Sequence, residues 1–127
     1  MSSVLAGQLA ARHLKPNGLL VLTGAALPFL EPTPDMLAYS LSKAATHSLA
    51  ANLASTLLNT TVVTLLPGVI DTESNRINMS EADKSSWVTT NSLSGLVKMW
   101  ADGNNQPKTG AFAIIKNHQG MAVPEFI

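Results

Sequence analysis

The sequence has 127 residues, of which 46% are hydrophobic and 13% charged. These proportions are typical of a globular protein, and the length suits a single domain. Eight basic residues balance eight acidic ones, and no basic cluster supplies the positive field that nucleic-acid binding requires. The absence of cysteine excludes disulfides and thiolate chemistry, and the three histidines share no metal-ligand spacing with acids. We therefore expect no nucleic acid, metal or membrane span, and a cytoplasmic location by default.

The first half of the sequence predicts a helix, a strand and a second, longer helix. Residues 2–14 have helical spacing and end at Lys15-Pro16-Asn17-Gly18. The apolar run over residues 18–23 is typical of a strand that is covered on both faces in a parallel sheet. Residues 24–32 are expected to form a loop. Thr33-Pro34-Asp35 then combines a cap, a proline and an acid, which predicts a helix reaching to about Leu58.

The rest of the sequence predicts two more strands with helices between them. The β-branched run over 60–66 indicates a second buried strand, which Pro67-Gly68 ends. Residues 80–83 have capping-box spacing for a short helix, residues 92–102 predict another helix, and residues 110–116 a third strand. Strands that alternate with helices pair in parallel. We therefore predict an α/β fold, a partial Rossmann-like parallel sheet of about three strands flanked by helices.

The long second helix carries a row of apolar residues and a smoother neighbouring surface. Four residues recur at a spacing of four and predict its buried face: Ala45, Leu49, Leu53 and Leu57. Four alanines, at positions 44, 50, 51 and 54, lie next to this row. Such small side chains favour close contact with another helix.

Tyr39 and Lys43 are the first candidates for chemistry. They lie four positions apart in a predicted helix, so their side chains share one face. An ammonium group beside a phenol favours the phenolate, which helps the phenol to exchange protons at neutral pH. The same spacing also occurs on surface helices without a function, so the neighbouring segments must decide. His47, one turn further on, can act on the lysine or simply bond to solvent.

Two segments in register supply that context. Tyr39-Ser40-Leu41-Ser42-Lys43 lies between two predicted strands, and Pro67-Gly68-Val69-Ile70-Asp71-Thr72 follows the second strand. In this order they resemble the Tyr-x-x-x-Lys helix and the Pro-Gly-x-x-x-Thr loop of the short-chain dehydrogenase/reductase family. The resemblance implies that Tyr39 donates a proton, and that Lys43 assists it and binds the nicotinamide ribose. It implies contacts to the nicotinamide end from Pro67, Gly68, Val69 and Thr72. Without it, Pro67-Gly68 is a strand-ending turn, and Thr72 is a helix cap or a solvated hydroxyl.

One position departs from the family's usual pattern. The family places a serine thirteen residues before the tyrosine, and here that position is Ala26, with Thr23 as a candidate substitute. The passage over 18–39 resembles those members of the family that lack the serine and reduce a pterin. This implies reduction of quinonoid dihydropterin to tetrahydropterin, with hydride from NADH or NADPH and a proton from Tyr39. Met79 and Trp87 are candidates for contact with the pterin, or for core packing.

The sequence also lacks a motif that the resemblance implies. No glycine-rich turn that could cradle a pyrophosphate follows an apolar strand. By comparison with the family, residues 1–127 would be the C-terminal half of the domain, without the dinucleotide-binding half. The strand over 18–23 would then form an open, apolar edge of the sheet. In the family the first two helices form a dimer interface, so the resemblance implies a homodimer through them.

Three hypotheses remain open at this point. The chain is a truncated or fragmentary reductase, or a non-catalytic module that dimerises or interacts through its helices. Alternatively, it is a minimal enzyme that binds NADH without phosphate anchors. The last is disfavoured, because contacts to nicotinamide alone would have to offset the whole cost of immobilising a large flexible ligand.

Overall fold

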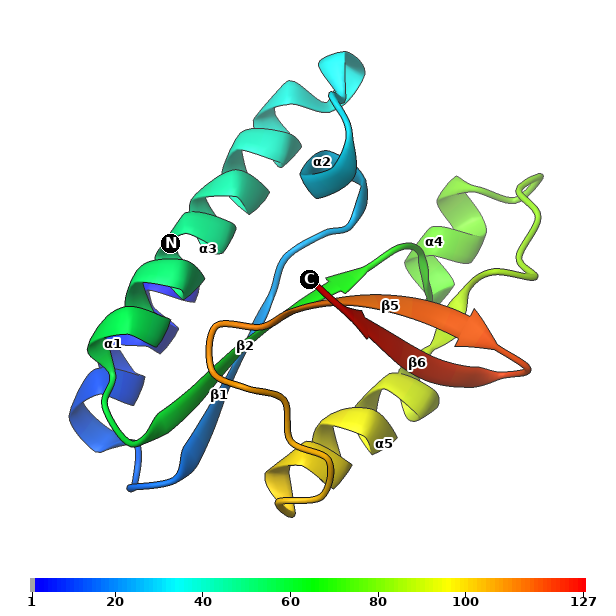
Figure 1. Ribbon diagram of the computed structural model, residues 1–127. Helices are drawn as coiled ribbons and strands as arrows, with labels where there is room; N and C mark the ends of the chain where they lie inside the picture. Colours follow the sequence, from blue (N-terminus) through cyan, green and yellow to red (C-terminus); the bar gives the residue numbers. More distant parts are fainter. Residues whose placement is uncertain (1) are drawn as a thin grey trace.

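The computed structural model describes residues 2–127, which form a sheet with helices on both faces (Figure 1). The helices are α1 (Ser2–His13), α2 (Leu27–Leu30), the 3-10 turn η1 (Pro34–Met36), α3 (Leu37–Thr56), α4 (Glu73–Asn78) and α5 (Thr90–Ala101). The strands are β1 (Gly18–Thr23), β2 (Thr60–Pro67), β3 (Ile70–Asp71), β4 (Val88–Thr89), β5 (Phe112–His118) and β6 (Met121–Phe126). None of the helices in this range is both long and apolar enough to cross a bilayer.

The main sheet has the strand order β1-β2-β5-β6, and β3 and β4 form a small parallel pair beside it. β1, β2 and β5 are parallel, which confirms the α/β class and the three predicted parallel strands. The fourth strand, β6, is antiparallel to β5 and was not predicted. It follows a two-residue turn, Gln119-Gly120, in which both residues have positive φ (50° and 84°). Such a turn has the twist that an antiparallel hairpin needs.

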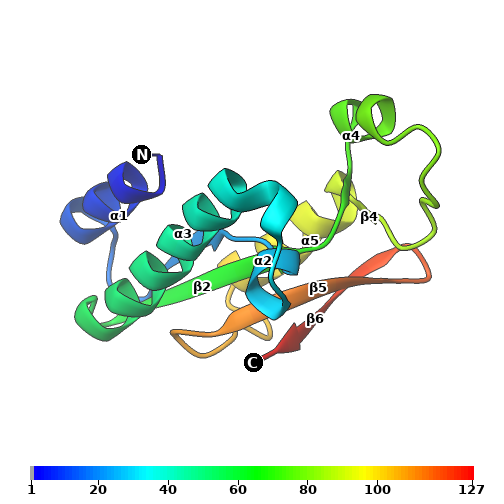
Figure 2. The same cartoon turned by 90° about the horizontal axis from the view of Figure 1, so that it is seen from above.

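Each face of the sheet packs against a different helix layer, as Figures 1 and 2 show. On one face Val62 of β2 lies in a buried cluster with Leu22 and Ala50, beneath α1 and α3. The next residue, Val63, points to the opposite face, where it packs with Trp100 of α5. Because successive side chains of a strand alternate in direction, the apolar run of β2 serves both cores at once.

β1 lies at one edge of the main sheet, as expected for the strand over 18–23. Among the described strands it pairs with β2 alone, and all six β1 residues are uncharged. β6 forms the opposite edge and contains Pro124, which has no N–H to donate to a further strand. The two edges therefore differ in their capacity to accept a strand.

One helix prediction and one loop prediction need correction. The short helix expected at residues 80–83 is absent, and these residues lie in a turn region. The helix instead begins at Glu73, because the Thr72 side chain caps it by accepting a hydrogen bond from the Asn75 N–H. In addition, the expected loop over 24–32 contains the single-turn helix α2.

The buried face of α3 is also rotated from the predicted one. Leu53 and Leu57 pack against the core as expected, but Ala45 is exposed. The buried residues of α3 are Thr46, His47 and Ala50. Two of these three are polar, so hydrophobic spacing alone could not place this face.

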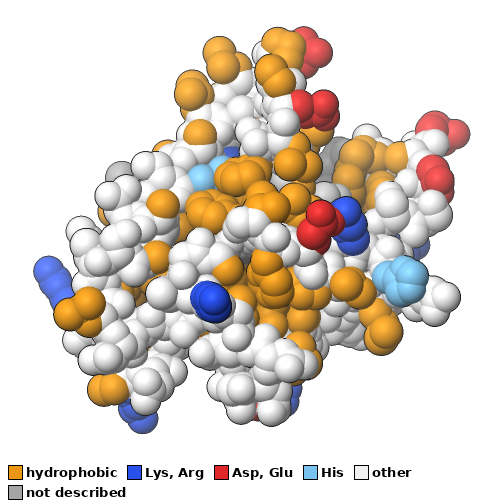
Figure 3. All heavy atoms as spheres, in the orientation of Figure 1, with side chains coloured by type: hydrophobic (Ala, Val, Ile, Leu, Met, Phe, Trp, Pro, Cys, Tyr) orange, Lys and Arg blue, Asp and Glu red, His pale blue; other side chains and the backbone are white. Residues whose placement is uncertain are grey.

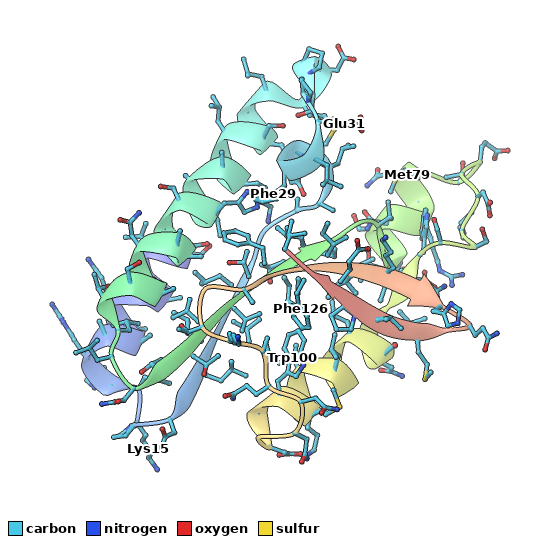
Figure 4. All side chains as sticks on the ribbon, viewed as in Figure 1. Lys15, Phe29, Glu31, Met79, Trp100 and Phe126 are labelled. Carbon is cyan, nitrogen blue, oxygen red and sulfur yellow. The ribbon has the colours of Figure 1, made fainter. Side chains whose placement is uncertain are left out.

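The surface around α2 and the end of β6 is markedly apolar. Figure 3 shows hydrophobic side chains gathered over the middle of this face. Exposed residues of these two elements include Leu27, Leu30 and Phe126. Phe126 joins this surface to the core, because its ring centroid lies 6.1 Å from that of the buried Trp100 of α5 (Figure 4).

Candidate functional site

Tyr39 and Lys43 lie one turn apart on α3, and their side chains meet as the spacing predicts. The Lys43 ammonium lies over the Tyr39 ring, 5.6 Å from its centroid, within the range of a cation–π contact. The same ammonium donates a hydrogen bond of 3.1 Å to the carbonyl oxygen of Thr23, the last residue of β1. Tyr39 is 43% exposed. A phenol that is partly exposed to solvent thus lies beside a cation at the carboxyl end of the sheet.

The segment that follows β1 is tied to its neighbours at Gly24 and Ala26. Gly24 N–H donates to the Leu65 carbonyl at 2.8 Å, and Ala26 N–H donates to the Pro67 carbonyl at 3.1 Å. Ala26 itself is buried. These bonds bring the end of β1 against the end of β2, so the position that replaces the family's serine lies beside the Pro67-Gly68 turn.

A small surface cavity adjoins Lys43. It has a volume of about 290 Å³ and lies between the start of α1, the end of β1 and Lys43, with Ser3 and Thr23 in its wall. A larger hollow lies at the amino end of β2, lined by Asn59 and Thr60 among others. The cavity beside Lys43 is the one that matches the chemistry, because ligands of parallel sheets bind beyond the carboxyl ends of strands.

The loop over 67–72 places its residues in different surroundings. Pro67 is buried, whereas Gly68 is exposed and has open space on the side where a Cβ would be. The Val69 carbonyl accepts a hydrogen bond from the Val88 N–H. Thr72 is the cap of α4, with its hydroxyl oxygen 3.2 Å from the Asn75 nitrogen. A hydroxyl that accepts one bond still has a proton to donate, so the cap leaves Thr72 able to bind a ligand.

An ion pair holds α4 against this loop. Arg76 donates two hydrogen bonds, of 2.5 and 2.6 Å, to the two carboxylate oxygens of Asp71. The guanidinium lowers the pKa of the Asp71 carboxyl below its ordinary value, chiefly through the hydrogen bond. Asp71 therefore stays ionised at neutral pH and helps to fix the segment that carries Thr72.

The two candidates for pterin contact differ in burial. Trp87 is 4% exposed, and its backbone carbonyl accepts a hydrogen bond from the Asn117 side chain. This is the core-packing alternative. Met79 is half-buried, at the end of α4.

The structure shows what His47 contacts, for which the sequence left two alternatives. His47 is buried, and its Nε2 accepts a hydrogen bond of 3.3 Å from the Ala25 N–H. It thus bonds to the segment after β1 and not to solvent. Within residues 2–127 no group of three or more acids and histidines is placed to hold a metal ion.

The comparisons with known proteins agree with this geometry. No protein-family model matches the chain. Over 115 residues it is 32% identical to dihydropteridine reductase from Dictyostelium discoideum, a match covering 87% of this chain and 49% of that protein. This chain is related to the short-chain dehydrogenases and reductases.

Two solved structures of short-chain dehydrogenases and related enzymes extend the likeness to the fold. A short chain dehydrogenase from Burkholderia cenocepacia J2315, in complex with NADP, is 26% identical with a TM-score of 0.71. The match covers 94% of this chain and 51% of that one. Acetoin dehydrogenase from Enterobacter cloacae is 25% identical with a TM-score of 0.70, over 88% of this chain and 48% of that one. The chain thus spans about half the length of each of these relatives.

Proposed function

We propose that this chain carries the proton-donating part of a dihydropteridine reductase site, at which NADH reduces quinonoid dihydropterin to tetrahydropterin. The observation that carries the proposal is the position of the Lys43 ammonium, between the Thr23 carbonyl and the Tyr39 ring. The identity to dihydropteridine reductase supports the choice of substrate.

Tyr39 is the proton donor in this proposal. Loss of its proton creates a phenolate, and the nearby ammonium stabilises that charge. The Thr23 carbonyl fixes the ammonium at the end of β1, so that little reorganisation is needed when the charge develops. Tyr39 is exposed enough for a bound pterin ring to reach it.

The donors near Tyr39 fit the nicotinamide and ribose end of a nicotinamide cofactor. An ammonium has three protons to donate, and the Thr23 carbonyl takes one, which leaves Lys43 able to bind ribose hydroxyls. Thr72 retains a hydroxyl proton, and the open space at Gly68 lets a flat ring approach the backbone over 67–69. When bound, the nicotinamide supplies the hydride. We propose NADH for this role, with NADPH as the alternative.

Ala26 in place of a serine suits a pterin better than a simple ketone. A methyl group cannot orient a carbonyl by a hydrogen bond, whereas a planar heteroaromatic ring can be held by apolar contact with few polar anchors. The buried position of Ala26, beside the Pro67 carbonyl, is consistent with such a wall.

The test combines cofactor binding with turnover. NADH and NADPH are titrated by tryptophan fluorescence against a complete subunit, in which a dinucleotide-binding half precedes residues 1–127, and against residues 1–127 alone. Reduction of quinonoid dihydropterin is followed with each cofactor. We expect the complete subunit to bind NADH, and its Tyr39→Phe variant to bind it with unchanged affinity while turnover falls by roughly 10²–10⁴-fold. This substitution keeps an aromatic ring beneath Lys43 and removes only the hydroxyl that gives up the proton.

Lys43→Met serves as the matched comparison, since it removes both the ammonium and its bonds. Turnover and NADH affinity should fall together in this variant. Equal turnover in wild type and Tyr39→Phe would remove Tyr39 from its role, and a complete subunit that does not bind NADH at all would favour the non-catalytic alternative.

That alternative is an interaction module, and the outer surface of two helices favours it. Val4, Leu5 and Leu9 of α1 are about half exposed, and Leu41 of α3 is 62% exposed. Small residues follow Leu41 on the exposed surface of α3: Ala44, Ala45, Ser48 and Ala51. We infer that α1 and α3 bind a second copy of this chain or a reductase subunit, with or without catalysis.

A further inference from the structure

His47 occupies a buried position between α3, the segment after β1 and two aromatic rings. The Phe29 ring of α2 and the Phe112 ring of β5 meet its imidazole edge-on, at centroid distances of 5.2 and 6.0 Å. The two phenyl rings stack on each other at 5.3 Å. Figure 4 shows Phe29 directed from α2 towards α3. These rings enclose the imidazole and restrict its orientation.

The hydrogen bond from Ala25 fixes the chemical state of this imidazole. A ring nitrogen that accepts a bond from a backbone N–H carries no proton, so Nε2 is bare and the proton of the neutral ring lies on Nδ1. In the charged imidazole both nitrogens would carry protons, and Nε2 would face the Ala25 N–H as a second donor. The contact therefore exists only with neutral His47.

Gly24 allows the ring to come this close to the backbone. A Cβ at this position would overlap the His47 ring and approach Leu66 Cδ2 to 2.8 Å. The hydrogen bond between His47 and Ala25 therefore requires a glycine at position 24.

The surroundings keep His47 neutral. Burial lowers its pKa below the ordinary 6.5, and the Lys43 charge on the same helix lowers it further. The other groups shown against the ring are Phe29, Phe112, the Ala25 N–H and the backbone at Gly24, none of which titrates.

Hydrogen bonds from α3 and from β2 alternate along residues 23–26. Lys43 and His47, one turn apart on α3, bind the Thr23 carbonyl and the Ala25 N–H. β2 binds the N–H groups of Gly24, between these two residues, and of Ala26, after them. If the bond to His47 is lost, only β2 holds the residues after Thr23, and the carbonyl that orients Lys43 gains freedom.

We propose that His47 is a positioning residue, whose neutral imidazole fixes residues 23–26 so that the Thr23 carbonyl holds the Lys43 ammonium beside Tyr39. Its effect on catalysis rests on the function proposed above. Its effect on the backbone does not, and the two can be measured separately in the same protein.

The test compares two variants with opposite hydrogen-bonding capacity. His47→Met fills the space without an acceptor, whereas His47→Gln retains an acceptor at similar reach. Amide hydrogen exchange, resolved by NMR, should be at least roughly 10-fold faster at Ala25 in His47→Met and close to wild type in His47→Gln. Gly24 and Ala26 are internal controls, because their N–H groups bond to β2 and should change little. General destabilisation would instead accelerate all three amides.

Nitrogen chemical shifts of His47 provide the second measurement. We expect an unprotonated Nε2 at neutral pH, and an Ala25 amide resonance that moves with the acid titration of the ring. A proton on Nε2 at neutral pH, or unchanged exchange at Ala25 in His47→Met, would overturn the proposal. If exchange responds as expected but the complete subunit has no reductase activity, the positioning role stands and the proposed function fails. If turnover is found but exchange at Ala25 is unchanged in His47→Met, the proposed function stands and the positioning role fails.

The free energy of unfolding should also depend on the protonation of His47. Because the pKa of His47 is lower in the folded chain, the unfolded chain takes up a proton first as the pH falls. The contribution of neutral His47 is fully present above pH 6.5 and is lost as the pH falls through the folded pKa. Chemical denaturation measures the free energy of unfolding from about pH 7.5 to about pH 5. This free energy should fall with decreasing pH in wild type and should fall less in His47→Gln. The same pH dependence in both proteins would contradict the prediction.

Discussion

Thr72 shows how one hydroxyl can serve a helix and a ligand at the same time. Its oxygen caps α4, while its proton remains free for the nicotinamide contact that the family resemblance implies. The structure confirms the cap, which was the alternative interpretation from sequence. Because a cap uses the acceptor and the ligand would use the donor, the two roles do not compete.

We predict that Thr72→Ala lowers the free energy of unfolding by about 1 kcal/mol and also weakens NADH binding. Thr72→Ser should restore both. Thr89→Ala is the control, because Thr89 caps α5 in the same way, with its hydroxyl oxygen 3.2 Å from the Ser92 nitrogen. That variant should lose similar stability and keep its NADH affinity. Unchanged NADH affinity in Thr72→Ala would leave Thr72 as a cap only.

At this scale the sequence predicted what is local and missed what is not. Tyr39 and Lys43 are four residues apart on one helix, so their contact follows from helical geometry. The bond between His47 and Ala25 joins residues 22 positions apart. It depends on how α3 crosses the end of β1, which no spacing within α3 reveals.

The helices α1 and α5 each contain a glycine, and the two glycines are packed differently. Gly7 of α1 is buried against α3, and a Cβ there would lie 2.8 Å from Leu53 Cδ1. Gly95 of α5 is exposed, and a Cβ there would meet nothing within 4 Å. The tight approach of α1 to α3 therefore depends on Gly7.

We predict opposite effects of alanine at these two positions. Gly95→Ala should raise the free energy of unfolding by about 0.5–1 kcal/mol, because alanine favours a helix and has room here. Gly7→Ala gains the same preference but displaces Leu53, and overpacking of this kind costs about 1–3 kcal/mol. Urea denaturation of both variants measures the difference. A similar gain in both would show that α1 packs less closely on α3.

The predicted elements succeeded where a single run of residues determines them. β1 and β2 follow from their apolar runs, and α5 matches the helix predicted over 92–102, although it begins at Thr90. β6 was missed because Gln119-Gly120 is not one of the usual hairpin pairs and Pro124 reads as a strand breaker. An edge strand tolerates that proline, but its place at an edge is known only from the sheet.

For the molecule as a whole, the open question is what covers the outer faces of α1 and α3. Exposed apolar side chains on these helices favour association, and relatives of similar fold are about twice as long. The placement of residues 1–127 as the C-terminal half of a domain stays a prediction.

We predict that the chain self-associates through these faces and that charged residues introduced on α1 prevent the association. Sedimentation velocity of wild type should show a dimer, and the double variant Leu5→Glu, Leu9→Glu should sediment as a monomer. Ile77→Glu is the control, since Ile77 is 70% exposed but lies on α4. A double variant that stays dimeric would place the contact elsewhere. Co-elution of the chain with intact dihydropteridine reductase, with altered activity, would support the module.

The unequal edges of the sheet give assembly a direction. At β6, Pro124 lacks a donor, and the charged Glu125 pairs with Lys116. At β1 a row of backbone groups is open to pairing, without proline or charge. Any strand that extends this sheet is therefore expected to join at β1, because β6 has lost one donor and carries charge. The sheet can thus be lengthened in one direction more readily than in the other.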